Sequence, residues 1–410
     1  MTLNYIWFAF FIVAFLTALV KVIFFGDTQV FTDIVNSTFE MSKTGFEISI
    51  YLTGVMALWL GLMKIGEEGG MVRILSRLVG PFFSKLFPDI PKDHPAQGAI
   101  IMNFSANILG LDNAATPLGL KAMNEMQELN TDKEKASNSQ IMFLVLNTSG
   151  LSIIPLTILV DRSVLNASNP TDVFLPILLA TFCSTIVGLI TVSIYQKINL
   201  WDRVILSYLG GLTLFIGLLV YYLTTLNPAE LDRFSGFASN FIIFSIMISF
   251  LVLGFKNKVD LYGTFIEGAK EGFQIAVKII PYLIAILVGI GVFRASGAMD
   301  YLIEGLRIIV SASGLNTDFV DALPVAVMKP LSGGAARGMM IETIKTHGAD
   351  SFVGQMASVF RGATETTFYI VAVYFGSVNI KNIRYAITAG LIADIAGIIA
   401  AIVFGYMFFH

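Results

Sequence analysis

Polar and charged side chains interrupt the apolar stretches of this chain at four places. The first two interruptions, residues 103–116 and 147–149, carry Asn, Asp, Thr and Ser side chains. The other two, residues 329–337 and 361–366, add Lys, Arg or Glu. A charged side chain inside a membrane span costs about 2.5–3.5 kcal/mol on insertion scales, so it persists mainly where it is paired or hydrated. Side chains of these types could therefore bind a small solute or an ion within a membrane.

The candidate solute-binding residues come from all four interruptions, and none is assigned a catalytic or metal-binding role. They are Asn103, Asn107, Asp112, Asn113, Thr116, Asn147, Thr148, Ser149, Lys329, Ser332, Arg337, Arg361, Thr364, Glu365 and Thr366. For Thr148 a second interpretation is equally open, because Thr and Ser hydroxyl groups also link membrane helices by hydrogen bonds.

Two of the interruptions predict broken helices. Pro117 has no N–H group and suits the first turn of a new helix, so the chain is expected to stop near Gly110 and restart there. In the second half, residues 325–344 are interrupted by Pro330 and by the Ser332-Gly333-Gly334 sequence. Unwound backbone is tolerated in a membrane only where it lines a cavity or is buried in protein. We therefore expect the two breaks to lie side by side near the middle of the membrane.

The charge of the solute is left open by two alternatives. The first alternative is that three cations, Lys329, Arg337 and Arg361, face the same cavity as two carboxylates, Asp112 and Glu365. One positive charge is then in excess, which favours an anionic solute. Alternatively, Arg361 pairs with Glu365, four residues away on one helical face, and Arg337 pairs with Asp112. The second arrangement leaves a nearly neutral pocket, which suits a polar uncharged solute such as a nucleoside.

The composition places the elements that carry these residues in lipid. Hydrophobic residues make up 55% of the 410 residues and charged residues only 13%, against about 25% charged in a typical soluble domain. Apolar runs long enough to cross a hydrocarbon core of about 30 Å cover residues 5–24, 46–63, 141–160, 173–194, 204–223, 241–255, 276–293 and 385–408. The expected fold class is an all-α, polytopic helical membrane protein.

An internal repeat divides the chain into two related halves. Residues 33–79 align without a gap on residues 260–306 at a constant shift of 227 residues. Matched pairs that shared apolarity cannot explain include Glu40 with Glu267, Lys43 with Lys270 and Gly70 with Gly297. The expected domains are residues 1–196 and 241–410, with a connecting span and loops at 197–240. Residues 69–87 and 297–310 alternate apolar and polar residues at helical spacing and predict amphipathic helices in the two halves.

The orientation of the halves is not settled by the basic residues. The loops at Lys197 and at Lys256 are basic and are expected in the cytoplasm by the positive-inside rule. If both halves share one orientation, Lys381 and Arg384 before the last span face the outside, against the same rule. The full topology therefore stays open.

Several classes of function are excluded or made improbable. The net charge of −3 is too small for the basic surface that nucleic acid requires. The chain has one Cys, three widely separated His, no HExxH sequence and no phosphate-binding loop. We therefore expect no metal centre, no cofactor and no hydrolysis of ATP. An intramembrane enzyme is the third and least favoured alternative. The sequence contains no G-x-S-x-G motif and no His within a span to act as a base.

The leading hypothesis is a transporter or channel-like protein, and the second is a membrane scaffold that transports nothing. The expected partners are membrane lipid and a small solute or ion, and homo-oligomerisation is compatible with the sequence. The short loops weigh against the scaffold, because none is long enough to form a docking domain.

The two halves resemble the spore maturation A and B membrane proteins fused end to end. Residues 109–119, LGLDNAATPLG, are similar to the A pattern, and residues 329–338, KPLSGGAARG, with Thr364-Glu365-Thr366 are similar to the B pattern. The resemblance implies one Gate domain in each half, a domain also found in nucleoside-transporter-like proteins and in ferrous-iron transporter B. It also implies a multi-pass protein of the bacterial cytoplasmic (inner) membrane and, from spore-forming relatives, a role in sporulation. The nucleoside label rests on likeness of fold, which does not fix a function.

Overall fold

The computed structural model describes residues 2–91, 94–108, 112–150 and 155–410. Within these ranges the regular elements are helices, and no β-strand is formed. The first group comprises α1 (Thr2–Phe25), α2 (Val30–Glu68), α3 (Met71–Leu86), α4 (Pro95–Ile108), α5 (Asp112–Leu129), α6 (Asn138–Ser149), α7 (Leu156–Val164), α8 (Phe174–Gln196) and α9 (Arg203–Thr224). The second group comprises α10 (Pro228–Lys256), α11 (Leu261–Ala295), α12 (Ala298–Ala312), the 3₁₀ turn η1 (Val320–Ala322), α13 (Leu323–Met328), α14 (Gly333–His347), α15 (Phe352–Gly362), α16 (Thr367–Ser377) and α17 (Ala386–Phe409).

Six helices of the described chain are long and apolar enough to cross a membrane, namely α1, α2, α8, α9, α10 and α17. A seventh span is possible where α11 and α12 meet at a bend of 76°. The expected all-α, polytopic fold class is therefore confirmed. One predicted span is wrong: the apolar run 141–160 is two helices, because α6 ends at Ser149 and α7 begins at Leu156.

The order of the helices repeats along the chain. The seven helices from α2 to α8 and the seven from α11 to α17 follow one another in the same sequence of long, short and long elements. Gly70 precedes α3 at φ 86° and Gly297 precedes α12 at φ 82°. This left-handed backbone strongly favours glycine, which explains why both members of the matched pair are glycines. The duplication predicted from the shift of 227 residues is thus visible in the backbone.

The described chain forms two compact units that do not coincide with the sequence halves. The first unit contains residues 1–61, 157–170 and 266–361, and the second contains residues 62–156, 171–265 and 362–410. The first unit therefore combines α12 to α15 with α7, whereas the second combines α3 to α6 with α16. The short helices α7 and α16 are therefore exchanged, because each belongs to the unit formed mainly by the other repeat. The sequence domains 1–196 and 241–410 describe the duplication and stay a prediction.

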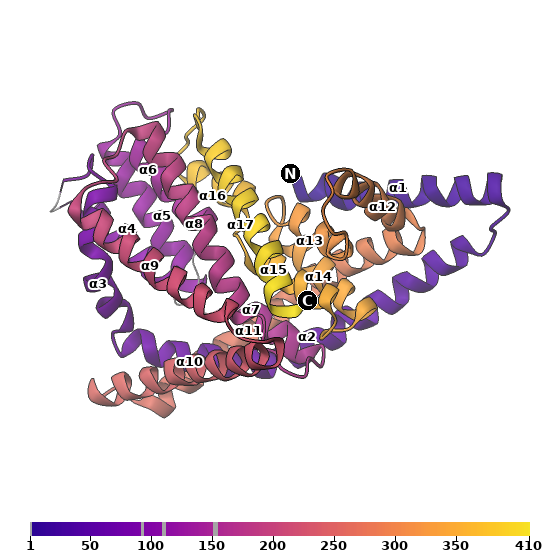
Figure 1. Ribbon diagram of the computed structural model, residues 1–410, viewed down its shortest axis with the longest axis horizontal. Coiled ribbons are helices and arrows are strands. Elements are labelled where there is room, and N and C mark those ends of the chain that lie inside the picture. Colours follow the sequence, from indigo (N-terminus) through magenta and orange to yellow (C-terminus); the bar gives the residue numbers. More distant parts are fainter. Residues whose placement is uncertain (1, 92–93, 109–111, 151–154) are drawn as a thin grey trace. The chain divides into compact units, whose positions relative to one another are not determined.

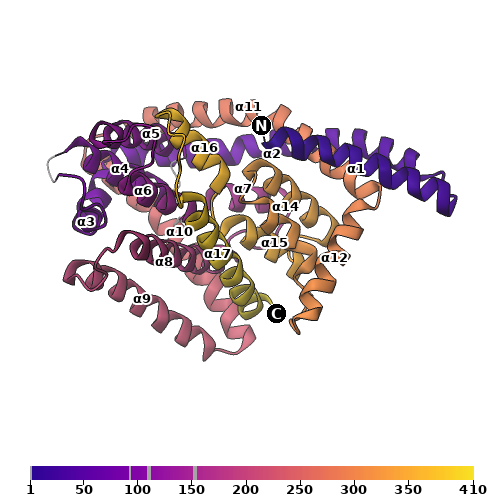
Figure 2. The same cartoon turned by 90° about the horizontal axis from the view of Figure 1, so that it is seen from above.

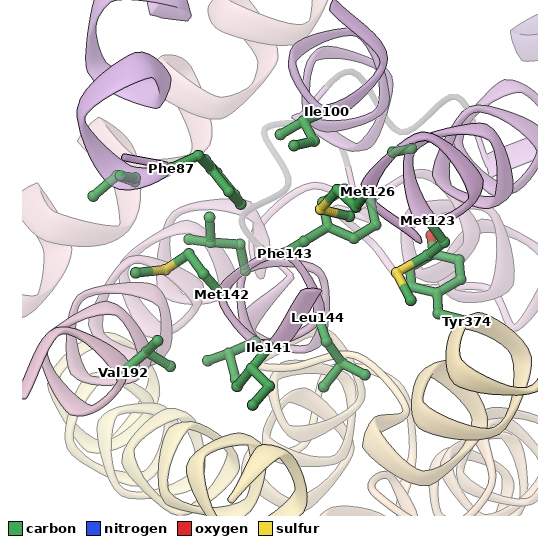
Figure 3. Packing of buried hydrophobic residues seen from close by; sticks show 14 of the residues in the cluster. Phe87, Ile100, Met123, Met126, Ile141, Met142, Phe143, Leu144, Val192 and Tyr374 are labelled. Atoms are coloured by element: carbon green, nitrogen blue, oxygen red, sulfur yellow. The ribbon is translucent and has the colours of Figure 1, made fainter. Parts of the chain in front are cut away.

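The core of the second unit surrounds helix α6. In Figure 1, α4, α5, α6 and α8 lie side by side with α16 and α17 next to them, and packing joins α6 to α8 and α17 and joins α16 to α5. Figure 3 shows Ile141, Met142 and Phe143 of α6 among side chains from these helices. Nearly every residue of α6 is buried, which is the pattern of a helix enclosed by protein on all sides.

The equivalent long helices α2 and α11 cross antiparallel in the first unit, where Figure 2 shows them together. A Cβ atom added at Gly45 would lie 3.1 Å from the Cα atom of Ile284. A Cβ atom added at Gly272 would lie 2.8 Å from the Cα atom of Ala57. Gly45 matches Gly272 and Ala57 matches Ile284 at the shift of 227, so one contact occurs twice with the repeats exchanged. Antiparallel packing of equivalent helices is the mark of an inverted repeat.

An inverted repeat removes the conflict over topology in the second unit. The end of α8 lies beside the start of α17, where the rings of Tyr195 and Tyr385 stack with centroids 4.3 Å apart. Lys197, after α8, and Lys381, before α17, therefore lie at the same end of this unit. The positive-inside rule and the repeat agree when the halves have opposite orientations.

The glycine crossing makes a testable prediction. Replacing Gly272 with Ala places a methyl group against the backbone of α2, where the Cβ would lie 2.8 Å from the Met56 carbonyl oxygen. We expect overpacking of this kind to destabilise the protein by about 1–3 kcal/mol and to lower its melting temperature in detergent. Gly54→Ala on α2 is the matched control, because nothing lies within 4 Å of its added Cβ. Equal melting temperatures for the two variants would show that α2 and α11 do not cross here.

Candidate functional site

Three of the predicted asparagines form one hydrogen-bonded group in the second unit. Asn103 and Asn107 lie one turn apart on α4, and Asn147 lies near the end of α6. The Asn107 side-chain amide donates to Asn147 Oδ1 at 2.8 Å and, more weakly, to Asn103 Oδ1 at 3.3 Å. Asn103 in turn donates to the carbonyl oxygen of Ala115 at 2.7 Å. This asparagine group thus links α4 and α6 to the start of α5, the helix that resumes after the break.

Tyr374 of α16 completes the asparagine group from the other repeat. Its hydroxyl group donates to Asn147 Oδ1 at 3.3 Å, and its ring stacks on Phe143 with centroids 5.4 Å apart. Gly119 of α5 lies directly beside the Tyr374 hydroxyl group, and an added Cβ there would collide with it. The sequence analysis missed Tyr374. Its only signal was a tyrosine hydroxyl in an apolar span, which needs a polar partner when buried.

The second and fourth interruptions meet through their backbones. The amide of Glu365 donates to the carbonyl oxygen of Thr148 at 2.9 Å. Gly150 ends α6 at φ 61°, and a Cβ added to it would lie 2.8 Å from Cγ of Glu365. The hydroxyl groups of Thr148 and Ser149 donate to carbonyl oxygens of α6 itself. These two residues therefore contribute backbone contacts to the site, and their hydroxyl groups are bonded within their own helix.

The fourth interruption contains a break between two helices, at residues 363–366. Helix α15 ends at Gly362 and α16 begins at Thr367, so Arg361 and Glu365 are not on one helical face. The expected geometry of that pair is wrong. Thr364 and Thr366 are buried, whereas Glu365 is exposed. The first residue of α16, Thr367, donates from its hydroxyl group to Asp394 Oδ2 of α17 at 2.7 Å, and both residues are buried.

In the first unit, Arg337 of α14 is paired with Asp161 of α7. The guanidinium Nε donates to Asp161 Oδ2 at 2.8 Å and Nη2 donates to Oδ1 at 2.5 Å. Asp161 is 1% exposed, so this is a buried, two-point ion pair. The alternative partner expected from the sequence, Asp112, has its side chain outside the described residues, so that pairing stays a prediction. Asp161 was not predicted as a partner, because it lies directly after the apolar run 141–160, which had been interpreted as one unbroken span.

Asp112 and Asn113 begin α5, but their side chains lie outside the described residues, as do residues 109–111. Thr116 is exposed. Asp112, Asn113 and Thr116 belong to the second unit, with the asparagine group.

Arg162, the next residue of α7, is fully buried in the first unit. Its Nη1 donates to the Ala349 carbonyl oxygen at 2.9 Å and to Ser358 Oγ at 3.3 Å. Its Nη2 lies 3.7 Å from a carboxylate oxygen of Asp350. Figure 2 shows α7 beside α14 and α15. Ala349 and Asp350 follow α14, and Ser358 is in α15. The Asp161-Arg162 pair therefore fixes a helix of the first repeat against helices of the second.

The remaining predicted residues of the first unit have local roles or are simply buried. Ser332 caps α14, because its Oγ accepts a hydrogen bond from the Ala335 amide at 3.2 Å. Lys329 ends α13 and is 1% exposed. Arg361 lies in the last turn of α15. Glu342 of α14, which was not predicted, is buried and forms an ion pair with Arg294.

The structure thus sorts the predicted residues into two groups. Asn103, Asn107, Asn147, Thr148 and Glu365 are brought together in the second unit. Lys329, Ser332, Arg337 and Arg361 belong to the first unit. The expectation that the two breaks lie side by side stays a prediction.

The family model described as "Gate: Nucleoside recognition" matches residues 49–160 and 276–381. The two matches start 227 residues apart, which equals the shift that aligns the repeat. Together they cover more than half of the chain and include the asparagine group and Tyr374, and the first match ends directly before Asp161.

Two curated relatives from Bacillus subtilis (strain 168) are similar to this chain. Spore maturation protein A is 48% identical over 158 residues, which is 38% of this chain and 81% of the relative. Spore maturation protein B is 46% identical over 158 residues, which is 38% of this chain and 87% of the relative. The chain therefore belongs to the Gate family of multi-pass membrane proteins, together with spore maturation proteins A and B.

Proposed function

We propose that this protein is a transporter or channel-like protein of the bacterial cytoplasmic membrane that passes a small, neutral, polar solute of the nucleoside class. The observation that carries the proposal is the group of Asn103, Asn107, Asn147 and Tyr374. These side chains are neutral, and they lie beside the start of α5, where the helix resumes after the break.

The chemistry of the asparagine group favours an uncharged solute with many hydrogen-bonding atoms. Each asparagine offers two N–H donors and one carbonyl acceptor, and the tyrosine hydroxyl group both donates and accepts. Base edges and ribose hydroxyl groups present the same mixture of donors and acceptors. Hydrogen bonds to such a solute can replace the hydrogen bond that Asn107 now donates to Asn147.

The ion pair of Arg337 weighs against an anionic solute. The guanidinium group of Arg337 faces the carboxylate of Asp161. This carboxylate was not included when one positive charge was inferred to be in excess. Arg162 likewise has Asp350 as an ionic partner. An anionic solute would have to displace a buried carboxylate from a two-point ion pair, which is costly.

The repeat supports movement of the solute across the membrane. Inverted repeats with broken helices are common in transporters, where one repeat rocks against the other around the binding site. The antiparallel contact of Gly45 and Gly272 with the opposite long helix has this symmetry. The name of the Gate family model adds nucleosides as the first solutes to test. A membrane scaffold of the spore maturation type remains the second candidate and predicts no flux.

The first prediction concerns uptake by purified protein in liposomes. We expect radiolabelled nucleosides to enter liposomes that contain the wild-type protein, and Asn147→Ala to lower the flux about 10-fold or more, because a lost solute bond and an unpaired Asn107 amide each cost about 1–3 kcal/mol. Asn240→Ala is the matched control, because Asn240 is an exposed asparagine of α10. Absence of any flux in the wild type would favour the scaffold, and full flux in Asn147→Ala would place the site elsewhere.

The second prediction tests the charge of the solute through the Arg337–Asp161 pair. We expect Arg337→Gln to destabilise the protein by about 3–5 kcal/mol, because it leaves Asp161 buried without its cation. The double variant Arg337→Gln with Asp161→Asn should recover most of the lost stability in a thermal melt. The proposal of a neutral solute is contradicted if Arg337→Gln folds as well as the wild type and selectively loses uptake of an anionic solute.

A further inference from the structure

A cluster of metal-ligating side chains lies at the open end of the α4–α5 hairpin. His94 directly precedes α4, and Glu125 and Glu128 lie near the end of α5. One ligand atom from each of these three residues lies within 4.8 Å of the other two. All three belong to the second unit, and the opposite end of the same hairpin carries the break and Asn107.

The spacing fits one bound cation. A transition-metal ion binds imidazole nitrogen and carboxylate oxygen at about 2.0–2.2 Å, so two ligand atoms on one ion are separated by at most about 4.4 Å. The cluster needs only small side-chain rotations to close to this distance. Glu128 is exposed and His94 and Glu125 are partly exposed, so the ion has a path from solution and room for water ligands.

The electrostatics of α5 also point to a cation. Glu125 and Glu128 are three residues apart on one helix, where like charges repel each other. They lie near the carbonyl end of α5, the negative end of the helix dipole, and the last turn of α5 contains no basic residue. Lys133 donates to the backbone carbonyl oxygens of Gln127 and Glu128 at 2.6 and 3.3 Å. A bound cation would offset the repulsion between the two carboxylates directly.

His94 can join such a site at a small cost. Its Nδ1 accepts one long hydrogen bond, 3.2 Å, from the amide of Ala96. A metal ion on Nδ1 takes this lone pair, and a metal ion on Nε2 moves the ring proton to Nδ1. Either mode of binding therefore ends one weak hydrogen bond and forms a metal–nitrogen bond in its place.

We propose that His94, Glu125 and Glu128 bind one divalent transition-metal ion, which ties the start of α4 to the end of α5. The imidazole ligand favours Zn²⁺ and Co²⁺ over Mn²⁺, and all three over Mg²⁺ and Ca²⁺, which prefer sites made only of oxygen atoms. The site goes beyond the proposed transport function. No metal was predicted because the His and Cys residues are widely separated in the sequence, whereas these ligands come from two segments that fold together.

The test measures metal binding to the full-length protein in detergent, purified without a polyhistidine tag and stripped with a chelator. We expect about one Zn²⁺ per chain by isothermal titration calorimetry and a visible absorption band with Co²⁺. His94→Ala and Glu125→Gln should each weaken Zn²⁺ binding at least 10-fold. His347→Ala is the matched control, because His347 is exposed at the end of α14, and it should bind Zn²⁺ like the wild type.

A second measurement covers the case in which a variant folds poorly. Zn²⁺ should raise the melting temperature of the wild type and of His347→Ala, because a ligand that binds only the folded state stabilises it. It should leave the melting temperature of Glu125→Gln and Glu128→Gln nearly unchanged. The proposal is overturned if the wild type binds no Zn²⁺, or if the His94, Glu125 and Glu128 variants bind it as tightly as the wild type.

Discussion

The structure depends on one constraint, which is that a backbone amide or carbonyl group cannot be left unpaired in hydrocarbon. Helices that end inside a membrane protein must therefore find partners for their last carbonyl groups. Helix α6 ends at Ser149, and the amide of Glu365, two residues before α16, donates to the carbonyl oxygen of Thr148. Gly150 makes this approach possible, because its left-handed backbone turns the chain away and a side chain there would collide with Glu365. The segment between α15 and α16 in the second repeat thus provides a hydrogen-bond donor for the end of α6 in the first repeat.

The exchange of short helices between the repeats follows from this constraint. Helices α7 and α16 occupy equivalent places in the two repeats, and each belongs to the compact unit built on the other repeat. Each also makes side-chain hydrogen bonds inside that unit. Arg162 of α7 donates to Ser358 of α15, and Tyr374 of α16 donates to Asn147 of α6. The two contacts differ in chemistry, charged in the first unit and neutral in the second, although they have the same place in the duplication.

The sequence was sufficient for the features that depend on local pattern. The fold class, the shift of 227 residues and the grouping of Asn103 with Asn107 follow from apolar length, matched polar residues and helical spacing. Asp161, Arg162 and Tyr374 were missed because their partners lie roughly 180–230 residues away in the chain, and no local pattern encodes a contact exchanged between repeats. The run 141–160 was interpreted as one span because of its apolar length, although Asn147-Thr148-Ser149-Gly150 and Pro155 interrupt it where α6 stops. The expected position of Arg361 and Glu365 on one helical face assumed a continuous helix, and this assumption was wrong, because α15 ends at Gly362.

The most direct test of the exchange is a disulfide between the end of α6 and the segment that precedes α16. In a Cys183→Ser background, Gly150→Cys and Glu365→Cys place two thiol groups on residues whose Cβ atoms would lie 3.5 Å apart, within the range of about 3.5–4.5 Å that a disulfide requires. Gly150→Cys with Gly376→Cys is the control, because Gly376 is about 14 Å along α16 from Thr367. We expect rapid oxidation of the 150–365 pair, measured by mass spectrometry of the linked peptides, and none of the 150–376 pair. Folded protein in which the 150–365 pair stays reduced would contradict it.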